Sequence, residues 1–236
     1  MALNLQTFKT RTLTAVLFAA VMLFGLLWNA WSFLILFTVI HFGCWYEFVK
    51  LMKKISSKNF VYYSFFGLFY ISLPCLMMID FISNFTHSNF TMISFEEIFN
   101  PFFNVIPCGI VFSIWINDTM AYIVGSLIGK TPFSKISPKK TWEGTIGGAI
   151  LCVVVIALLG YFIPVAQLIA VKHWIAIAAI CAVFGTAGDL LESKIKRMSN
   201  VKDSGSFMPG HGGFLDRFDS LLVATPFVWL YVTLFL

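Results

Sequence analysis

Charged side chains are scarce in this sequence. Asp, Glu, Lys and Arg make up 11% of the 236 residues, whereas apolar residues make up 59%. A soluble domain carries about 25% charged residues, so this chain has too few to cover a water-facing surface. The composition therefore excludes an ordinary soluble domain and predicts an integral membrane protein.

Several recurrent patterns are also missing. The five cysteines form no CxxC pair and lie in apolar runs, which indicates small apolar fillers and not metal ligands or disulfides. The "GKT" at 129–131 is not a P-loop, because Val124 stands where the first glycine is needed. The sequence has no internal repeat and no Pro/Ser-rich linker. We therefore predict one membrane-embedded domain over 1–236, with N-terminal spans in 1–100 and a catalytic half in 101–236.

Long apolar runs are what the sequence has instead. They fall at about 12–28, 30–49, 60–80, 103–127, 145–165, 172–190 and 217–236. A spanning helix needs about 20 residues, and lipid offers no partner for free backbone groups, so each run is predicted to be helical. The expected fold is all-α, a polytopic integral membrane protein with about seven transmembrane helices.

The basic residues lie on one side of this predicted membrane protein. With seven spans, the N-terminus and the loops at about 50–59, 128–144 and 191–216 share a side that holds every Lys and Arg except Lys172. Cytoplasmic loops are rich in Lys and Arg, so we expect the N-terminus and the active-site loops to be cytoplasmic. The net charge of +5 then faces anionic lipid and not nucleic acid. The absence of a targeting extension favours a bacterial cytoplasmic (inner) membrane.

The first polar stretch lies at 117–148. Asp118 stands inside an apolar run, where a carboxylate is costly and usually faces a protein or water-filled interior; the alternative is a helix-packing hydrogen bond. "SPKKTWEG" at 137–144 places Lys139 beside Lys140, and paired Lys charges suit polyphosphate. The alternative there is membrane anchoring by basic and aromatic residues. Three glycines are expected to let the next helix pack closely: Gly144, Gly147 and Gly148.

The second polar stretch joins the last two apolar runs. Two pairs of carboxylates, each three residues apart and so on one helical face, lie at its ends: Asp189 with Glu192, and Asp216 with Asp219. Two such faces can form the oxygen-rich cavity that Mg²⁺ prefers. Carboxylates for a divalent ion and cations for phosphates suit metal-assisted phosphoryl or nucleotidyl transfer. The glycines of "PGHGG" at 209–213 allow close approach of phosphate oxygens. The alternative is a salt-bridged interfacial loop.

A longer stretch carries a resemblance to a known family. "SKIKRMSNVKDSGSFMPGHGGFLDRFDS", residues 193–220, closely resembles the signature of the phosphatidate cytidylyltransferases, or CDP-diacylglycerol synthases. Met208 departs from the pattern, which usually has Leu, Ile or Phe there, but Met keeps the apolar volume. The resemblance runs over about 117–220. It implies an enzyme that joins CTP and phosphatidic acid into CDP-diacylglycerol and releases pyrophosphate. The implied cofactor is Mg²⁺, and whether a monovalent cation joins it stays open.

The resemblance also implies roles for single residues. The expected metal ligands are Asp189, Asp216 and Glu192. The expected catalytic residues are Lys202, Asp203, His211, Arg217 and Asp219, of which Asp219 is also a candidate second ligand and His211 a candidate hydrogen-bond donor. The expected substrate-binding residues are Lys139, Lys140, Ser193, Lys196, Arg197, Gly212 and Gly213. Asp118 is a further polar residue of the expected site.

Three alternatives stay open at this point. A related enzyme could use another anionic lipid phosphate, or a lipid kinase could transfer the γ-phosphoryl group, and pyrophosphate release separates the kinase from a cytidylyltransferase. A transporter or channel could use Asp118, Asp189 and Asp216 for a cation, but the ionisable residues cluster at one end of two spans. A catalytically inactive relative is the third, although every expected charged position is present. The sequence also leaves a homodimer open.

Overall fold

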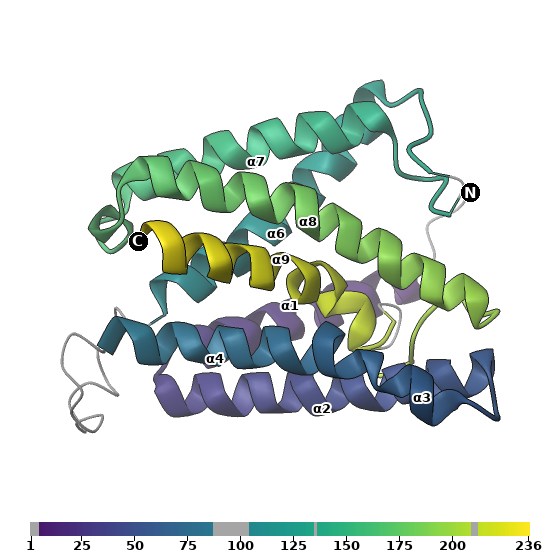
Figure 1. Cartoon of the computed structure of the whole chain (residues 1–236). Coiled ribbons are helices and arrows are strands. Elements are labelled where there is room, and N and C mark those ends of the chain that lie inside the picture. Colours follow the sequence, from purple (N-terminus) through teal and green to yellow (C-terminus); the bar gives the residue numbers. More distant parts are fainter. Residues whose placement is uncertain (1–4, 87–103, 135, 209–211) are drawn as a thin grey trace. The chain divides into compact units, whose positions relative to one another are not determined.

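The structure is a computed structural model that describes residues 5–86, 104–134, 136–208 and 212–236, with the side chains of 5–11 and 83–86 left out (Figure 1). The regular elements in these ranges are helices, without a strand. Six of them are long and apolar enough to cross a membrane: Ala30–Ile55, Phe60–Ile82, Val105–Ile128, Trp142–Phe162, Val171–Met198 and Leu215–Phe235. The predicted all-α, polytopic membrane fold is confirmed.

The six candidate spans of the described residues compare with the predicted number of about seven. The first predicted span, 12–28, falls in α1 (Leu5–Leu27), a helix of 23 residues that is described with its side chains over residues 12–27. The sixth predicted span also ends later than expected, because α8 (Val171–Met198) continues beyond residue 190. Its last turn carries Lys196 and Arg197, and cations stabilise the negative end of a helix dipole.

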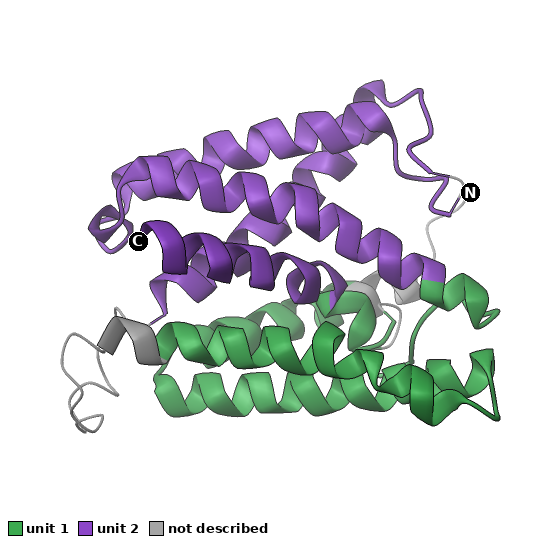
Figure 2. Cartoon of the chain, viewed as in Figure 1, with its two compact units in different colours: residues 1–103, 195–218 green, residues 104–194, 219–236 purple. Residues whose placement is uncertain are grey.

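The chain forms two compact units. Unit 1 contains residues 1–103 and 195–218, and unit 2 contains residues 104–194 and 219–236 (Figure 2). The N-terminal spans lie in unit 1, and the division predicted at residue 100 stays a prediction. The segment 195–218, which we predicted within the catalytic half, packs with those spans.

Unit 1 is organised around the long helix α2 (Ala30–Ile55). This helix begins at a capping box in which the Asn29 side chain accepts a hydrogen bond from the Ser32 amide and Ser32 Oγ accepts one from the Asn29 amide. Its apolar face is buried against the other N-terminal helices: α1, α3 (Phe60–Ser64), the π-helix η1 (Leu68–Ser72) and α4 (Leu73–Thr86). Among the buried residues of α2, Glu47 is the charged one, with 4% of its surface exposed.

Unit 2 is built on the close pair α6 (Val105–Ile128) and α7 (Trp142–Phe162). A Cβ atom on Gly148 would lie 2.6 Å from Ala121 Cα, and one on Gly144 would lie 2.9 Å from Gly125 Cα. The prediction that glycines let this helix pack closely is therefore confirmed. The short η2 (Ala166–Leu168), most of α8 and most of α9 (Leu215–Phe235) complete the unit. The five cysteines are free and buried, as fillers should be.

Candidate active site

Glu143 fixes the loop that joins α6 to α7. Its carboxylate accepts hydrogen bonds from the Lys130 amide at 3.2 Å, from the Thr131 amide at 3.1 Å and from Thr131 Oγ1 at 2.9 Å. The Phe133 amide donates to the Lys140 carbonyl at 2.7 Å, which ties the two arms of the loop together. The Lys130 and Thr131 amides of the "GKT" segment thus donate to a carboxylate of their own chain, and the Gly129 amide donates to the Gly125 carbonyl.

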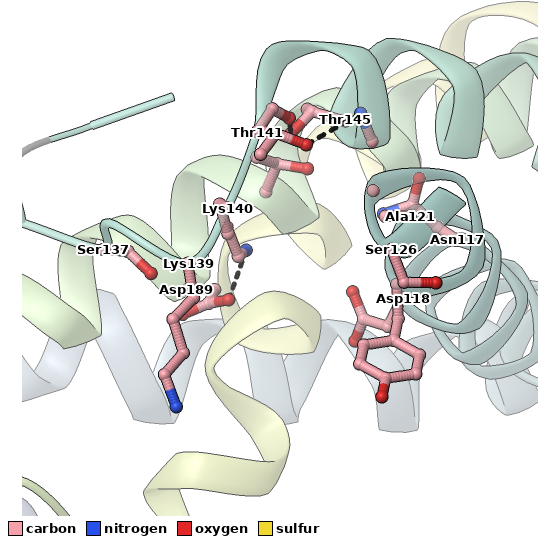
Figure 3. Close-up of a pocket in the computed structure, with 14 residues that line it drawn as sticks. Asn117, Asp118, Ala121, Ser126, Ser137, Lys139, Lys140, Thr141, Thr145 and Asp189 are labelled. Atoms are coloured by element: carbon pink, nitrogen blue, oxygen red, sulfur yellow. Dashed lines mark hydrogen bonds and ion pairs between the residues drawn. The ribbon is translucent and has the colours of Figure 1, made fainter. Parts of the chain in front are cut away.

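The fixed loop presents its paired lysines to a pocket of about 430 Å³ in unit 2 (Figure 3). Lys139 and Lys140 line it from the loop, Asn117 and Asp118 from α6, and Asp189 from α8. Lys140 Nζ forms an ion pair with the Asp189 carboxylate, which Figure 3 shows as a dashed line. The structure therefore places four of the predicted site residues in one pocket.

Asn117 adds a polar group that the sequence analysis did not single out. Its side chain is 4% exposed, and its Oδ1 accepts no hydrogen bond from the described residues. Leaving a buried acceptor without a donor costs about 1–3 kcal/mol. Because Asn117 also lines the pocket, a donor on a bound ligand would complete this amide's hydrogen bonding.

Three carboxylates gather where α8 meets α9. Asp189, Glu192 and Asp219 each offer an oxygen, and these oxygens lie within 4.8 Å of one another. Glu192 is fully buried and Asp219 is 8% exposed. Gly188 permits this arrangement, because a Cβ atom there would collide with the Asp219 carbonyl oxygen and would lie 3.0 Å from Ser220 Cα. We call Asp189, Glu192 and Asp219 the carboxylate group.

The carboxylate group has the donor chemistry of a magnesium site. Octahedral Mg²⁺ binds oxygens at about 2.1 Å, which places adjacent ligands about 3.0 Å and opposite ligands about 4.2 Å apart, so the three oxygens would move toward one another to share an ion. Ser193 Oγ donates a hydrogen bond to Asp189 Oδ1 at 3.2 Å. A hydrogen bond to a ligating carboxylate orients that carboxylate. The predicted site residue Ser193 therefore lies beside the carboxylate group, in contact with Asp189.

The glycine-rich loop, which we define as residues 202–214, contacts Asp216 within unit 1 through its described residues Ser204 and Gly213. Asp216 Oδ2 accepts hydrogen bonds from the Gly213 amide at 2.7 Å and from the Ser204 amide at 2.9 Å. Asp216 Oδ1 pairs with Lys196 Nζ at 2.6 Å. Both ends of the loop are therefore held by one carboxylate at the start of α9.

The carboxylate group contains two of the three predicted metal ligands, Asp189 and Glu192, together with Asp219, which we predicted as a candidate second ligand. The third predicted ligand, Asp216, lies in unit 1. Asp216 binds loop amides and Lys196 instead. The two aspartates have the same sequence signal, so the sequence did not distinguish them. Their metal roles stay predictions.

Comparison with known proteins identifies the family. The sequence model of the cytidylyltransferase family matches residues 85–235, which is more than half of the chain. The chain belongs to the cytidylyltransferase family. The match includes the pocket, the carboxylate group and the glycine-rich loop.

Curated relatives in this cytidylyltransferase family align over about half of the chain. The phosphatidate cytidylyltransferase of Bacillus subtilis is 46% identical over 124 residues, which are 52% of this chain and 45% of that protein. That of Staphylococcus haemolyticus is 44% identical over 116 residues, 48% of this chain and 43% of that protein. The chloroplastic phosphatidate cytidylyltransferase 4 of Arabidopsis thaliana is 42% identical over 115 residues, 49% of this chain and 29% of that protein. Each alignment spans less than half of the relative.

The remaining predicted residues of the cytidylyltransferase signature lie on or beside the glycine-rich loop. Gly212 has a φ of 87°, a conformation that favours glycine. Arg197 Nη1 donates to the Val201 carbonyl at 3.4 Å. Four charged side chains are exposed: Arg197, Lys202, Asp203 and Arg217. His211 lies outside the described residues.

Glu47 is a contact of the cytidylyltransferase loop that the sequence analysis missed. From α2, its Oε2 accepts hydrogen bonds from Ser204 Oγ at 2.7 Å and from the Leu215 amide at 2.9 Å. A single carboxylate inside an apolar run is the signal that could have found Glu47. The same signal drew attention to Asp118. Glu47 lies outside the matched region, so the family pattern offers no hint of it.

Proposed function

We propose that the protein transfers a cytidylyl group from CTP to phosphatidic acid, giving CDP-diacylglycerol and pyrophosphate. The observation that carries this proposal is a pocket with paired lysines that shares Asp189 with a group of three carboxylates. Both lie in the region matched by the cytidylyltransferase family. The names of the bacterial and plant relatives supply the acceptor, phosphatidate.

The reaction joins two anions, so charge neutralisation is the first task of the site. A phosphate oxygen of phosphatidate forms the new bond to the α-phosphorus of CTP, the bond from that phosphorus to the β-phosphate oxygen breaks, and pyrophosphate leaves. The attacking oxygen is already ionised at neutral pH, so the step needs no dedicated base. Lys139 and Lys140 neutralise and orient phosphate oxygens in the pocket.

Asp189, Glu192 and Asp219 are the proposed holders of Mg²⁺. When bound, the ion would polarise a phosphate oxygen and stabilise the charge that develops in the transition state. Ser193 keeps the Asp189 carboxylate oriented, and Gly188 keeps Asp219 within reach of α8. The ion pair between Lys140 and Asp189 connects the carboxylate group to the phosphate-binding lysines.

The glycine-rich loop is proposed to bind phosphate as well. Its neighbourhood holds three exposed cations: Arg197, Lys202 and Arg217. Lys196 has a different part, because it pairs with Asp216, the carboxylate that binds the Ser204 and Gly213 amides. The loop amides of Ser204 and Gly213 are bound to Asp216, so we assign phosphate contacts to the exposed cations and not to these two amides.

We also propose that this chain is a multi-pass protein of a bacterial cytoplasmic membrane, with a cytoplasmic N-terminus. The basic loops support this orientation, and CTP is a cytosolic substrate. Ser206 is exposed in the glycine-rich loop, so Ser206→Cys should react with an impermeant thiol reagent only from the cytoplasmic face. The parent protein, whose five cysteines are buried, is the control. The homodimer stays a prediction that light scattering in detergent can check.

The deciding experiment uses the purified full chain in detergent. Phosphatidic acid, Mg²⁺ and CTP labelled at the α-phosphate are incubated, and label in the lipid phase is followed together with pyrophosphate. Both signals should rise in equal amounts and stop when EDTA is added. Label that enters the lipid only from γ-labelled nucleotide would show a kinase. A folded preparation that labels no phosphatidate, but labels another lipid phosphate, would change the acceptor.

A further inference from the structure

We infer that Glu47 is a positioning residue for the glycine-rich loop, so that a helix outside the matched region sets the conformation of the family signature. The functional part of this inference rests on the proposed cytidylyl transfer. The structural part does not, because it concerns the contacts between α2 and residues 202–215 within unit 1.

The hydrogen bonds of Glu47 go to both ends of the loop. Ser204 follows its start, and Leu215 begins α9 directly after its end. Ser204 Oγ also lies 2.9 Å from Asp216 Oδ2, so this hydroxyl stands between two carboxylates. Glu47 and Asp216 therefore close the loop together, one from α2 and the other from α9.

The glycines of the loop point to the same contact. Among the described residues, Gly212 is the glycine with positive φ, so Gly205 and Gly213 adopt backbone conformations that other residues also adopt. Their small size is needed for another reason, since a Cβ atom on either would collide with the Glu47 carboxylate. The space that both glycines leave open is therefore occupied by the Glu47 carboxylate, which would have to move if either glycine gained a side chain.

The face of α2 around Glu47 is shaped for the loop. One turn earlier, a Cβ atom on Gly43 would lie 2.6 Å from the ring of Phe214. Both residues line a pocket of about 640 Å³ together with Glu47 and Gly205. Glu47 thus binds a loop hydroxyl and the first amide of α9 from the same face of α2.

Two variants of Glu47 test whether its hydrogen bonds position the glycine-rich loop. Glu47→Gln keeps the length and an oxygen that can accept both hydrogen bonds, so we expect it to keep kcat within about tenfold of the parent. Glu47→Ala releases the loop, and misplacement by about 1 Å can cost about 100-fold. We expect that loss in kcat, with KM for CTP changed less than threefold because the pocket lysines are untouched. Equal losses in the two variants, or a loss confined to KM, would overturn the positioning role.

A second measurement tests the contact without any activity. Gly205→Ala should lower the melting temperature in the parent, because its Cβ meets Glu47, and should cost clearly less in the Glu47→Ala background, where that space is free. In the Glu47→Ala protein, the rate of hydrogen exchange at the Ser204, Gly213 and Leu215 amides should be higher than in the parent. Gly185→Ala, whose nearest atom would lie 3.5 Å away, is the control and should be additive with Glu47→Ala. Additive costs for Gly205 and Glu47 would refute the contact.

The two measurements keep failures apart. A parent protein without cytidylyl transfer refutes the proposed function, and the melting and exchange data then decide the structural part alone. If Glu47→Ala does not fold, the comparison is made in the Glu47→Gln protein. Gly205→Ala should lower the melting temperature there as much as in the parent, because the glutamine side chain still fills the space. A cost that disappears in Glu47→Gln would overturn the assignment.

Discussion

Substituting Gly188 by alanine should separate α8 from α9 at the carboxylate group. Alanine is favoured over glycine inside a helix by about 1 kcal/mol, but its Cβ would meet the Asp219 carbonyl and lie 3.0 Å from Ser220 Cα. Ordinary carbon contacts lie at about 3.5–4.0 Å, so the α9 backbone must move by about 0.5–1 Å. Such overpacking costs about 1–3 kcal/mol, which offsets or outweighs the gain in helix propensity.

Gly185→Ala is the matched control, one turn earlier in the same helix. The nearest atoms to its new Cβ would lie at 3.5 and 3.9 Å, which is ordinary contact. This variant should keep the gain of up to about 1 kcal/mol. The two proteins should therefore differ by about 1–3 kcal/mol, which is about 2–12 °C in melting temperature at about 2–4 °C per kcal/mol.

The assay combines stability with the response to Mg²⁺. We expect the parent and Gly185→Ala to melt higher as Mg²⁺ is added, because an ion that binds the folded state stabilises it. Gly188→Ala should lose most of that shift and about 100-fold in rate, the cost of a misplacement of about 1 Å. If Gly188→Ala keeps the full Mg²⁺ shift while its stability falls, the ion does not bind at Asp189, Glu192 and Asp219.

Three further substitutions test the pocket and the two aspartates. Lys140→Ala should lower kcat/KM for CTP about 10- to 100-fold, since a charge-assisted hydrogen bond contributes about 1.5–3 kcal/mol. Lys130 lies in the same loop but outside the pocket lining, so Lys130→Ala should change kcat/KM little. Asn117→Leu should raise the melting temperature by removing a buried acceptor and still weaken CTP use, and an unchanged KM would exclude a contact with the nucleotide. Asp219→Asn should raise the Mg²⁺ concentration for half-maximal rate, whereas Asp216→Asn should lower the rate without that change; the reverse pattern would restore Asp216 as the metal ligand.

The sequence predicted the features that depend on local pattern. Apolar runs set the helices, the adjacent residues Lys139 and Lys140 both line one pocket, and the three-residue spacing of Asp189 and Glu192 put both on one face of α8. These features need only the helical period and the chemistry of the side chains. Residues that act within a few positions of each other are therefore readable from the chain alone.

The features that the sequence did not predict depend on contacts between distant segments. Asp216 and Asp219 have the same spacing and chemistry, and only the direction of each side chain in the fold separates loop binding from the carboxylate group. Glu143 stood inside a quoted motif, but its partners at residues 130 and 131 become neighbours only when the loop folds back. Glu47 meets a loop that lies far along the chain.

That distance has a consequence for how the protein is made. Glu47 is 157 residues ahead of Ser204, the partner of its carboxylate. At a synthesis rate of about 5–20 residues per second, α2 waits about 8–30 s before the glycine-rich loop emerges. A carboxylate in a bilayer without partners is costly, so a nascent α2 should stay beside the insertion machinery or a chaperone during this interval. Ribosomes stalled before residue 204 should therefore yield crosslinks from α2 to that machinery, and Glu47→Leu should shorten their lifetime.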